Sequence, residues 1–285
     1  MSPEPVTPAP DVVPRWHRYV ALGDSFTEGM ADPDPRTPGE YRGWADRLAE
    51  ALHVRRVADG AQGLEYANLA VRGRLLDQIL AEQLPVALDS GADLVSIVGG
   101  GNDVLRPGTD PDDLAARLED AVRLLRGTGA DVLMATGVDP RNAPLIQRTR
   151  GKVATYNSHI WSIASRHGAR VIDLWGLRAL RDWRLWADDR IHLSAEGHRR
   201  VAGLALHTLG LATGGEHAVP LDPEPPRPRL DVLRDDAAWV RGHVAPWLGR
   251  RLRGRSSGDG RTAKRPHPAP VEPVPLDPAP LDVRD

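Results

Sequence analysis

Short apolar runs alternate with helical segments along most of this chain, and this alternation restricts the folds that it can adopt. Five runs are predicted as strands; the first and third are compact apolar runs without helical spacing, which is typical of strands buried on both faces. The five runs span residues 19–22, 65–70, 93–98, 131–135 and 169–174. Strands that alternate with helices form parallel sheets covered by helices on both faces. The sequence therefore predicts an α/β domain with a parallel sheet of five strands.

The helical segments between these strands are recognised by apolar residues on one stripe. They are expected at 42–52, 75–84, 111–126 and 147–167, and from a cap at Ser194 to about residue 209. The chain has 285 residues, 41% of them hydrophobic and 27% charged, which suits one soluble domain with extensions. A formal net charge of −2 gives no global field for nucleic acid. The absence of cysteine excludes disulfides, thiolate zinc sites and cysteine nucleophiles.

Composition divides the chain into five parts. Residues 1–17 are proline-rich with low order expected, and 18–212 form the α/β domain. A proline-rich linker at 213–229, an amphipathic helix at 230–253 and a basic, proline-rich tail of low order at 254–285 follow. We expect the helix to pack on its own domain rather than on an anionic membrane or a partner protein. The first 18 residues contain neither a signal peptide nor a membrane span, so a cytoplasmic location is expected.

One serine lies where the first predicted strand gives way to a helix. Gly23 permits a sharp turn after the strand, and the chain becomes helical after Ser25. The Ser25 hydroxyl would then stand at the carboxyl end of a strand, where reactive groups gather in open α/β sheets. Two interpretations of this stretch stay open: Ser25 is a nucleophile, or it only caps the helix.

Two further strand ends carry residues that can stabilise negative charge. Gly73 follows the second strand, where a glycine lets the backbone approach a ligand closely. Asn102 follows the third strand in a Gly-Gly-Gly-Asn-Asp run, and its side-chain amide can donate to a developing oxyanion. The run lacks the spacing of a nucleotide-binding loop. Taken alone, Gly73 is better interpreted as an ordinary loop glycine than as part of a ligand site. For Asn102 alone, an oxyanion donor and a residue that only stabilises its own turn are equally good interpretations.

Asp189 and His192 lie three residues apart in the loop before the last helix. That spacing lets the carboxylate fold back onto a ring nitrogen and fix which nitrogen carries the proton. Taken alone, the pair still favours a structural role. A metal site at His192, Glu196 and His198 is disfavoured, because the last two point to different sides of the helix and no fourth ligand is apparent.

Four motifs occur in order along the chain: Gly-Asp-Ser at Ser25, then Gly73, Gly-Gly-Asn-Asp at Asn102, and Asp189-x-x-His192. Together they resemble the SGNH (GDSL-type) esterase and acylhydrolase family, over about residues 18–212. The first motif continues with Phe26 where many members have leucine, and Leu193 stands where many have proline. Neither departure removes a reactive group.

The resemblance implies a three-layer α/β/α fold with a parallel five-stranded sheet. It also implies that Ser25 attacks an acyl carbonyl, that His192 takes and returns the proton, and that Asp189 orients the ring. The oxyanion would be met by the backbone N–H groups of Ser25 and Gly73 and by the Asn102 amide. No metal or organic cofactor is implied.

The leading hypothesis is a serine esterase or acylhydrolase that cleaves a small-molecule carboxylic ester through an acyl-enzyme intermediate. The sequence shows no lid-like apolar insertion, which favours small or polar substrates over long-chain lipids. The alternative is a non-catalytic binding module on the same fold, with the C-terminal tail as its partner-binding element. Nucleic acid is not an expected partner, and the sequence leaves the oligomeric state open.

Overall fold

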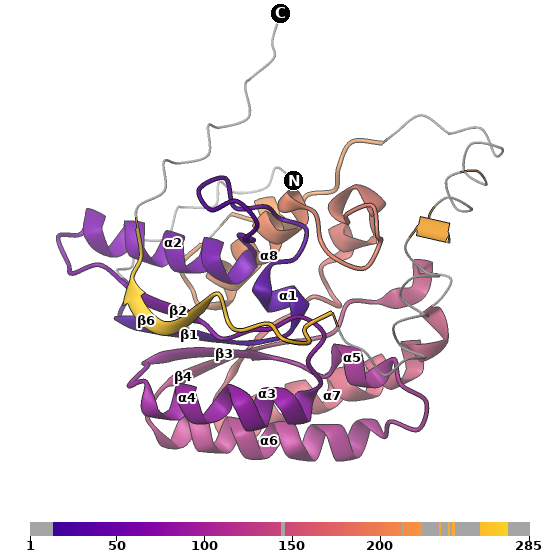
Figure 1. The fold of residues 1–285 in the computed structure, drawn as a ribbon, viewed down its shortest axis with the longest axis horizontal. Coiled ribbons are helices and arrows are strands. Elements are labelled where there is room, and N and C mark those ends of the chain that lie inside the picture. The colour runs from indigo at the N-terminus through magenta and orange to yellow at the C-terminus, as the bar shows by residue number, and fades with distance from the viewer. Residues whose placement is uncertain are drawn as a thin grey trace, which may run out of the picture.

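A six-stranded sheet forms the middle layer of the molecule (Figure 1). The computed structural model describes residues 14–143, 146–212, 214–223 and 257–272, together with residues 234, 239, 241 and 242. The strand order is β5-β4-β3-β1-β2-β6, and all pairs are parallel except β2 with β6. The strands are β1 (Arg18–Gly23), β2 (Glu65–Asn68), β3 (Leu94–Val98), β4 (Asp131–Ala135), β5 (Arg170–Ile172) and β6 (Arg265–Pro270).

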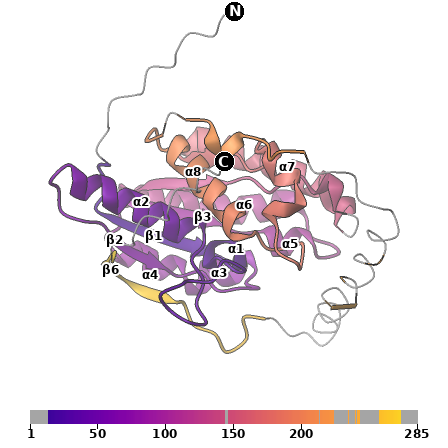
Figure 2. The same cartoon turned by 90° about the horizontal axis from the view of Figure 1, so that it is seen from above.

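Helices cover both faces of the sheet, as Figures 1 and 2 show. One face carries α3 (Leu76–Glu82), α4 (Leu84–Asp89), α6 (Pro111–Gly127) and α7 (Arg150–His167), and the other carries α2 (Trp44–Ala58) and α8 (Ala195–Thr208). Two very short helices, α1 (Ser25–Glu28) and α5 (Gly101–Val104), follow β1 and β3. The 3-10 turns are η1 (Pro140–Asn142), η2 (Gln147–Thr149), η3 (Arg178–Arg181), η4 (Trp183–Leu185) and η5 (Glu216–Ala218).

The central strand β1 shows why this sheet is buried on both sides. Val20 and Leu22 belong to the hydrophobic core on the α3–α7 face, whereas Tyr19 and Ala21 belong to the core under α2 and α8. All four side chains are fully buried. A continuous apolar run is the pattern that such a two-sided strand requires. The five predicted parallel strands and the helical layers on both faces are confirmed.

The sequence prediction was wrong about the C-terminal region around β6, which was expected to have low order. Arg265–Pro270 pairs antiparallel with β2, so the sheet is mixed and has six strands rather than five. Prolines occupy every second position of this strand, 266, 268 and 270. The Val271 N–H donates to the Leu64 carbonyl oxygen at 2.9 Å. The non-proline residues of the strand alternate with the prolines, as Val271 does, so their N–H groups point toward β2. Proline tolerates an edge strand when its missing N–H would face solvent.

Other predictions for the C-terminal region cannot be compared with the structure. The predicted amphipathic helix at 230–253 lies outside the described residues, apart from four positions within it. The predicted linker at 213–229 is described only over residues 214–223. Within the described part of the chain, no helix has the length and apolar character needed to span a membrane.

Candidate active site

Ser25 is the first residue of α1, directly after the turn that ends β1. The turn is tight at Gly23, since a Cβ atom there would lie 2.7 Å from the Val98 carbonyl oxygen. The buried Gln83 side chain holds both backbone groups of Gly23. Its Oε1 accepts from the Gly23 N–H at 2.8 Å, and its amide donates to the Gly23 carbonyl at 2.9 Å. Ser25 therefore stands on a braced turn at the carboxyl end of β1.

Asp24 caps α1 and reaches across to the end of β3. Its Oδ1 accepts from the Phe26 N–H at 3.1 Å, and its Oδ2 accepts from the Asn102 amide at 3.0 Å. Burial raises the pKa of Asp24 to about 6, although the Phe26 N–H and the charge of His192 act in the opposite direction. The Asp24 carboxyl group is thus a buried acceptor beside the candidate nucleophile.

Asn102 lies in α5, after the glycine run that ends β3. Its amide nitrogen also donates to the Arg74 carbonyl at 3.0 Å, so it connects loops that follow three strands. Gly100 allows this loop to turn, because its φ is +94° and a Cβ there would lie 2.8 Å from the Tyr156 ring. Both N–H groups of Asn102 are engaged, so a substrate oxyanion would share or displace one of these acceptors.

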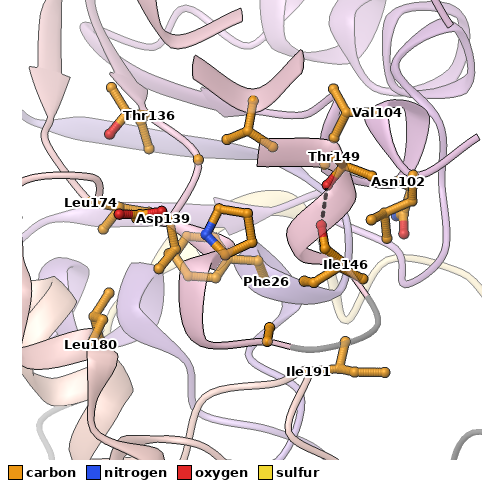
Figure 3. A pocket seen from close by; sticks show the side chains of 18 of the residues that line it. Phe26, Asn102, Val104, Thr136, Asp139, Ile146, Thr149, Leu174, Leu180 and Ile191 are labelled. Atoms are coloured by element: carbon orange, nitrogen blue, oxygen red, sulfur yellow. Dashed lines mark hydrogen bonds between the residues drawn. The ribbon is translucent and has the colours of Figure 1, made fainter. Parts of the chain in front are cut away.

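Ser25, Asp24 and Asn102 line a cavity of about 270 Å³ at the carboxyl ends of the parallel strands. Figure 3 shows Asn102 with other residues of the cavity wall. Most of its other lining residues are apolar, among them Phe26, Val98, Val104, Val138, Ile146, Val153, Leu174, Leu180, Trp183, Trp186 and Ile191. Asp139 is a second acidic residue of the lining, and its carboxylate pairs with Arg150 at 2.6 Å and Arg181 at 3.3 Å. The hydrogen bond from Arg150 lowers the pKa of Asp139. The cavity is therefore an apolar pocket beside one serine hydroxyl.

Gly73 lies in the turn after β2 with a φ of +73°, a conformation that favours glycine. Its neighbour Arg72 ties this turn to the end of α1. The Arg72 N–H donates to Oε2 of Glu28 at 2.6 Å, and the Arg72 guanidinium binds the same carboxylate. Gly73 is not among the residues that line the cavity wall, but its turn is held against the helix that begins at Ser25.

Asp189 and His192 are in direct contact. Oδ2 of Asp189 lies 2.6 Å from Nδ1 of His192, and Oδ1 accepts from the backbone N–H groups of Ile191 and His192, both at 2.9 Å. Burial alone would raise the pKa of Asp189, but the hydrogen bonds from His192 and Ile191 outweigh it and hold this pKa at about 2. The ionised carboxylate places the proton on Nδ1 and leaves Nε2 as an acceptor.

The structure brings the serine and the Asp189–His192 turn to one cavity. Arg190 and Ile191, within that turn, line the same pocket as Ser25, whereas Asp189 and His192 are not among its lining residues. His192 interacts electrostatically with Asp24, next to the serine. Among the described residues, no hydrogen bond joins the Ser25 hydroxyl to the His192 ring. Catalytic hydrogen bonds are often long without substrate and shorten in the complex.

The other two residues weighed as metal ligands have protein partners. Nδ1 of His198 accepts from the Trp44 N–H at 3.2 Å, and its Nε2 lies 3.1 Å from the Met30 carbonyl oxygen. Glu196 pairs with Arg199 and Arg200 along α8. In the part of the chain that is described, no group of three acidic or histidine side chains is arranged to hold a metal ion.

Sequence reasoning missed two supports of this site, Gln83 beneath the serine turn and the Glu28–Arg72 pair. It also missed Lys264, whose ammonium donates to the Glu28 carbonyl at 2.7 Å. Glu28 lies three residues after Ser25, and Arg72 directly precedes Gly73. Opposite charges beside two motif residues could have suggested that pair. Nothing local marks Gln83 or Lys264, because their partners are distant in sequence.

Residues 21–200 match the model of the GDSL-like lipase/acylhydrolase family. The chain belongs to this family. Its members are carboxylic ester hydrolases, and all five predicted site residues lie in the matched region. No curated protein matches the chain.

Solved structures share the fold of this family member. An α/β hydrolase enzyme named LAE5, from the metagenome of Lake Arreo in Spain, is 21% identical with a TM-score of 0.59; the match covers 70% of this chain and 97% of that one. A variant of Axe2, an acetyl xylan esterase from Geobacillus stearothermophilus, is 19% identical with a TM-score of 0.57, over 70% and 96% of the two chains. A lipase/acylhydrolase from Enterococcus faecalis is 20% identical with a TM-score of 0.52, over 69% and 97%.

Proposed function

We propose that this GDSL-family protein hydrolyses carboxylic esters through an acyl-enzyme on Ser25. The observation that carries the proposal is the shared cavity: Ser25 lines it, and so does the turn in which Asp189 binds the His192 ring. A serine beside an oriented imidazole is the arrangement that activates a hydroxyl for attack on a carbonyl. The family match to ester hydrolases supports the same reaction.

In the first half-reaction, Oγ of Ser25 attacks the acyl carbonyl and its proton moves to Nε2 of His192. The resulting oxyanion is stabilised by the N–H groups of Ser25 and Gly73 and by the Asn102 amide. When the tetrahedral intermediate collapses, the ester C–O bond breaks and the leaving alcohol takes the proton from His192. Asp189 remains ionised throughout and stabilises the imidazolium. Water then attacks the acyl-enzyme with His192 as base, which releases the acid and restores Ser25.

The cavity favours an apolar acyl group of modest size. Its lining is largely aliphatic and aromatic, and its volume of about 270 Å³ lies below the usual range of about 300–1,000 Å³ for ligand pockets. A short or medium acyl chain fits these dimensions, whereas a long-chain lipid would extend outside. We propose esters of such acids as the substrates.

Labelling by a fluorophosphonate probe, followed by peptide mass spectrometry, tests the mechanism. We expect phosphonylation of Ser25 in the wild-type protein and its loss in Ser25→Ala and His192→Ala. Ser162→Ala, which changes an exposed serine on α7, serves as the control and should label like the wild type. A folded wild-type protein whose Ser25 stays unlabelled would instead favour the binding-module hypothesis.

The oxyanion role of Asn102 is tested separately. Asn102→Ala should lower kcat by about 10²–10³ on p-nitrophenyl butyrate, the usual effect of losing one oxyanion donor. An unchanged kcat would remove Asn102 from the oxyanion site. A series of p-nitrophenyl esters should show the highest kcat/KM at short or medium acyl length.

A further inference from the structure

Residues 257–272, which we call the C-terminal clamp, lie against the loops of the active site. In Figure 1 the segment continues from β6 past α1. The centre of its contact is Lys264, whose side chain is only 9% exposed. The Lys264 ammonium donates to the Glu28 carbonyl at 2.7 Å, to the Tyr41 carbonyl at 2.6 Å and to Oδ2 of Asp46 at 2.7 Å. Its three N–H groups thus join three separate elements at one buried point.

These partners connect Lys264 to the proposed nucleophile and to one oxyanion donor. Glu28 is the last residue of the four-residue helix that begins at Ser25. The Glu28 carboxylate binds the backbone and guanidinium of Arg72, which directly precedes Gly73. The Arg72 guanidinium also stacks on the ring of Tyr41, 5.0 Å from its centroid. Movement of Lys264 would therefore reach both the α1 helix and the Gly73 turn.

Other contacts place the same segment against the Gly73 turn and the sheet. Gly258 lies so close to Arg72 that a Cβ atom would come within 2.0 Å of the Arg72 carbonyl oxygen. Arg265 lies over the ring of Tyr66 in β2, at 5.9 Å. The clamp is therefore fixed on both sides of Lys264 and can hold the ammonium in place.

We propose that Lys264 is a positioning residue for catalysis, which holds the end of α1 and the Arg72–Gly73 turn in register so that Ser25 and the Gly73 N–H meet the same carbonyl group. The proposal rests on the proposed ester hydrolysis. The clamp lies outside the region that matches the family, which ends at residue 200. Lys264 does not line the cavity and acts through α1 and the Gly73 turn, so we expect its loss to change kcat more than KM.

The test compares Lys264→Met with wild type for p-nitrophenyl butyrate hydrolysis and for the rate of fluorophosphonate labelling at Ser25. We expect kcat and the labelling rate to fall about tenfold or more with KM nearly unchanged, because small misplacements of reacting groups are costly. Lys264→Arg, which keeps a cation and several N–H donors, should recover part of the loss. Unchanged kcat in a folded Lys264→Met protein would overturn the proposal.

Two controls separate positioning from general destabilisation. Arg261→Met removes the same charge from an exposed side chain of the clamp and should keep wild-type kcat. Val271→Ala removes buried methyl groups after β6, so it should lower the melting temperature while keeping kcat in the folded protein. An equal kcat loss in Val271→Ala, or failure of both Lys264 variants to fold, would make Lys264 merely structural. If wild-type Ser25 is not labelled at all, the proposed function itself has failed.

Discussion

Asp24 accepts hydrogen bonds from the serine turn and from Asn102, so a change of its carboxylate tests how these two hydrogen bonds contribute to activity. Above its pKa of about 6 the carboxylate accepts from the Asn102 amide and from the Phe26 N–H. In Asp24→Asn the new amide can keep its oxygen on Phe26 only by turning its N–H groups toward the amide of Asn102. We expect kcat for p-nitrophenyl butyrate at pH 8 to fall by about tenfold to a hundredfold, since misorienting a donor costs less than deleting it. KM should change little, because the apolar wall is untouched.

Asp110→Asn is the matched control for this substitution. Asp110 also caps a helix, α6, through the N–H of the residue two positions on, but it is exposed and does not line the cavity. Asparagine caps helices about as well as aspartate, so both variants should keep their helices. Equal activity in the two variants would show that Asp24 only caps α1.

Among the elements, the alternating prolines of β6 bear on how the exposed edge of the sheet behaves. Its prolines leave N–H groups only at alternate positions, and an edge without donors cannot add another strand. We expect replacement of Pro266 and Pro268 by threonine to increase self-association, measured by light scattering over time at fixed concentration. His267→Thr raises β-propensity without adding an N–H group, so it should remain like wild type. If the His267→Thr protein self-associates as much as the double proline variant, side-chain β-propensity rather than the N–H donors of the edge controls the self-association.

Elements were predictable where their own residues carry the signal. The strands β1, β3 and β4 are almost entirely buried and show as largely apolar runs, and β4 matched its predicted bounds of 131–135. The helix predicted at 42–52 extends to Ala58, because after Leu52 the apolar Val54 and Val57 are exposed while Arg56 is buried, so the apolar stripe does not continue. The strand β6 has few apolar residues and exists through pairing with β2, and such a tertiary effect leaves no local pattern.

At the scale of the whole molecule, the site combines contacts between residues that are close in sequence with contacts between residues that are far apart. The Asp189–His192 contact spans three residues, and its spacing alone was enough to predict that the two side chains could meet. Asp24, Arg74 and Asn102 meet only because the parallel strands end at one edge of the sheet. The contact of Lys264 with Glu28 spans 236 positions, so only the folded chain reveals it.

His198 gives the whole molecule a predictable sensitivity to acid. The ring is fully buried and uncharged, and burial lowers its pKa from 6.5 to about 3. Between these values the unfolded chain binds a proton that the folded chain does not, so the free energy of unfolding falls as pH drops from 6.5 toward 3. Asp24 acts in the opposite direction, since its pKa is raised from 3.8 to about 6 and its contribution to the free energy of unfolding grows as pH falls through that interval.

A comparison with His198→Asn therefore isolates the histidine, because Asp24 is common to both proteins. We expect the stability advantage of wild type over the variant, measured by urea unfolding, to shrink by about 1.4 kcal/mol per pH unit below 6.5. Parallel stability curves from pH 8 to pH 4 would show that the ring does not resist protonation in the fold.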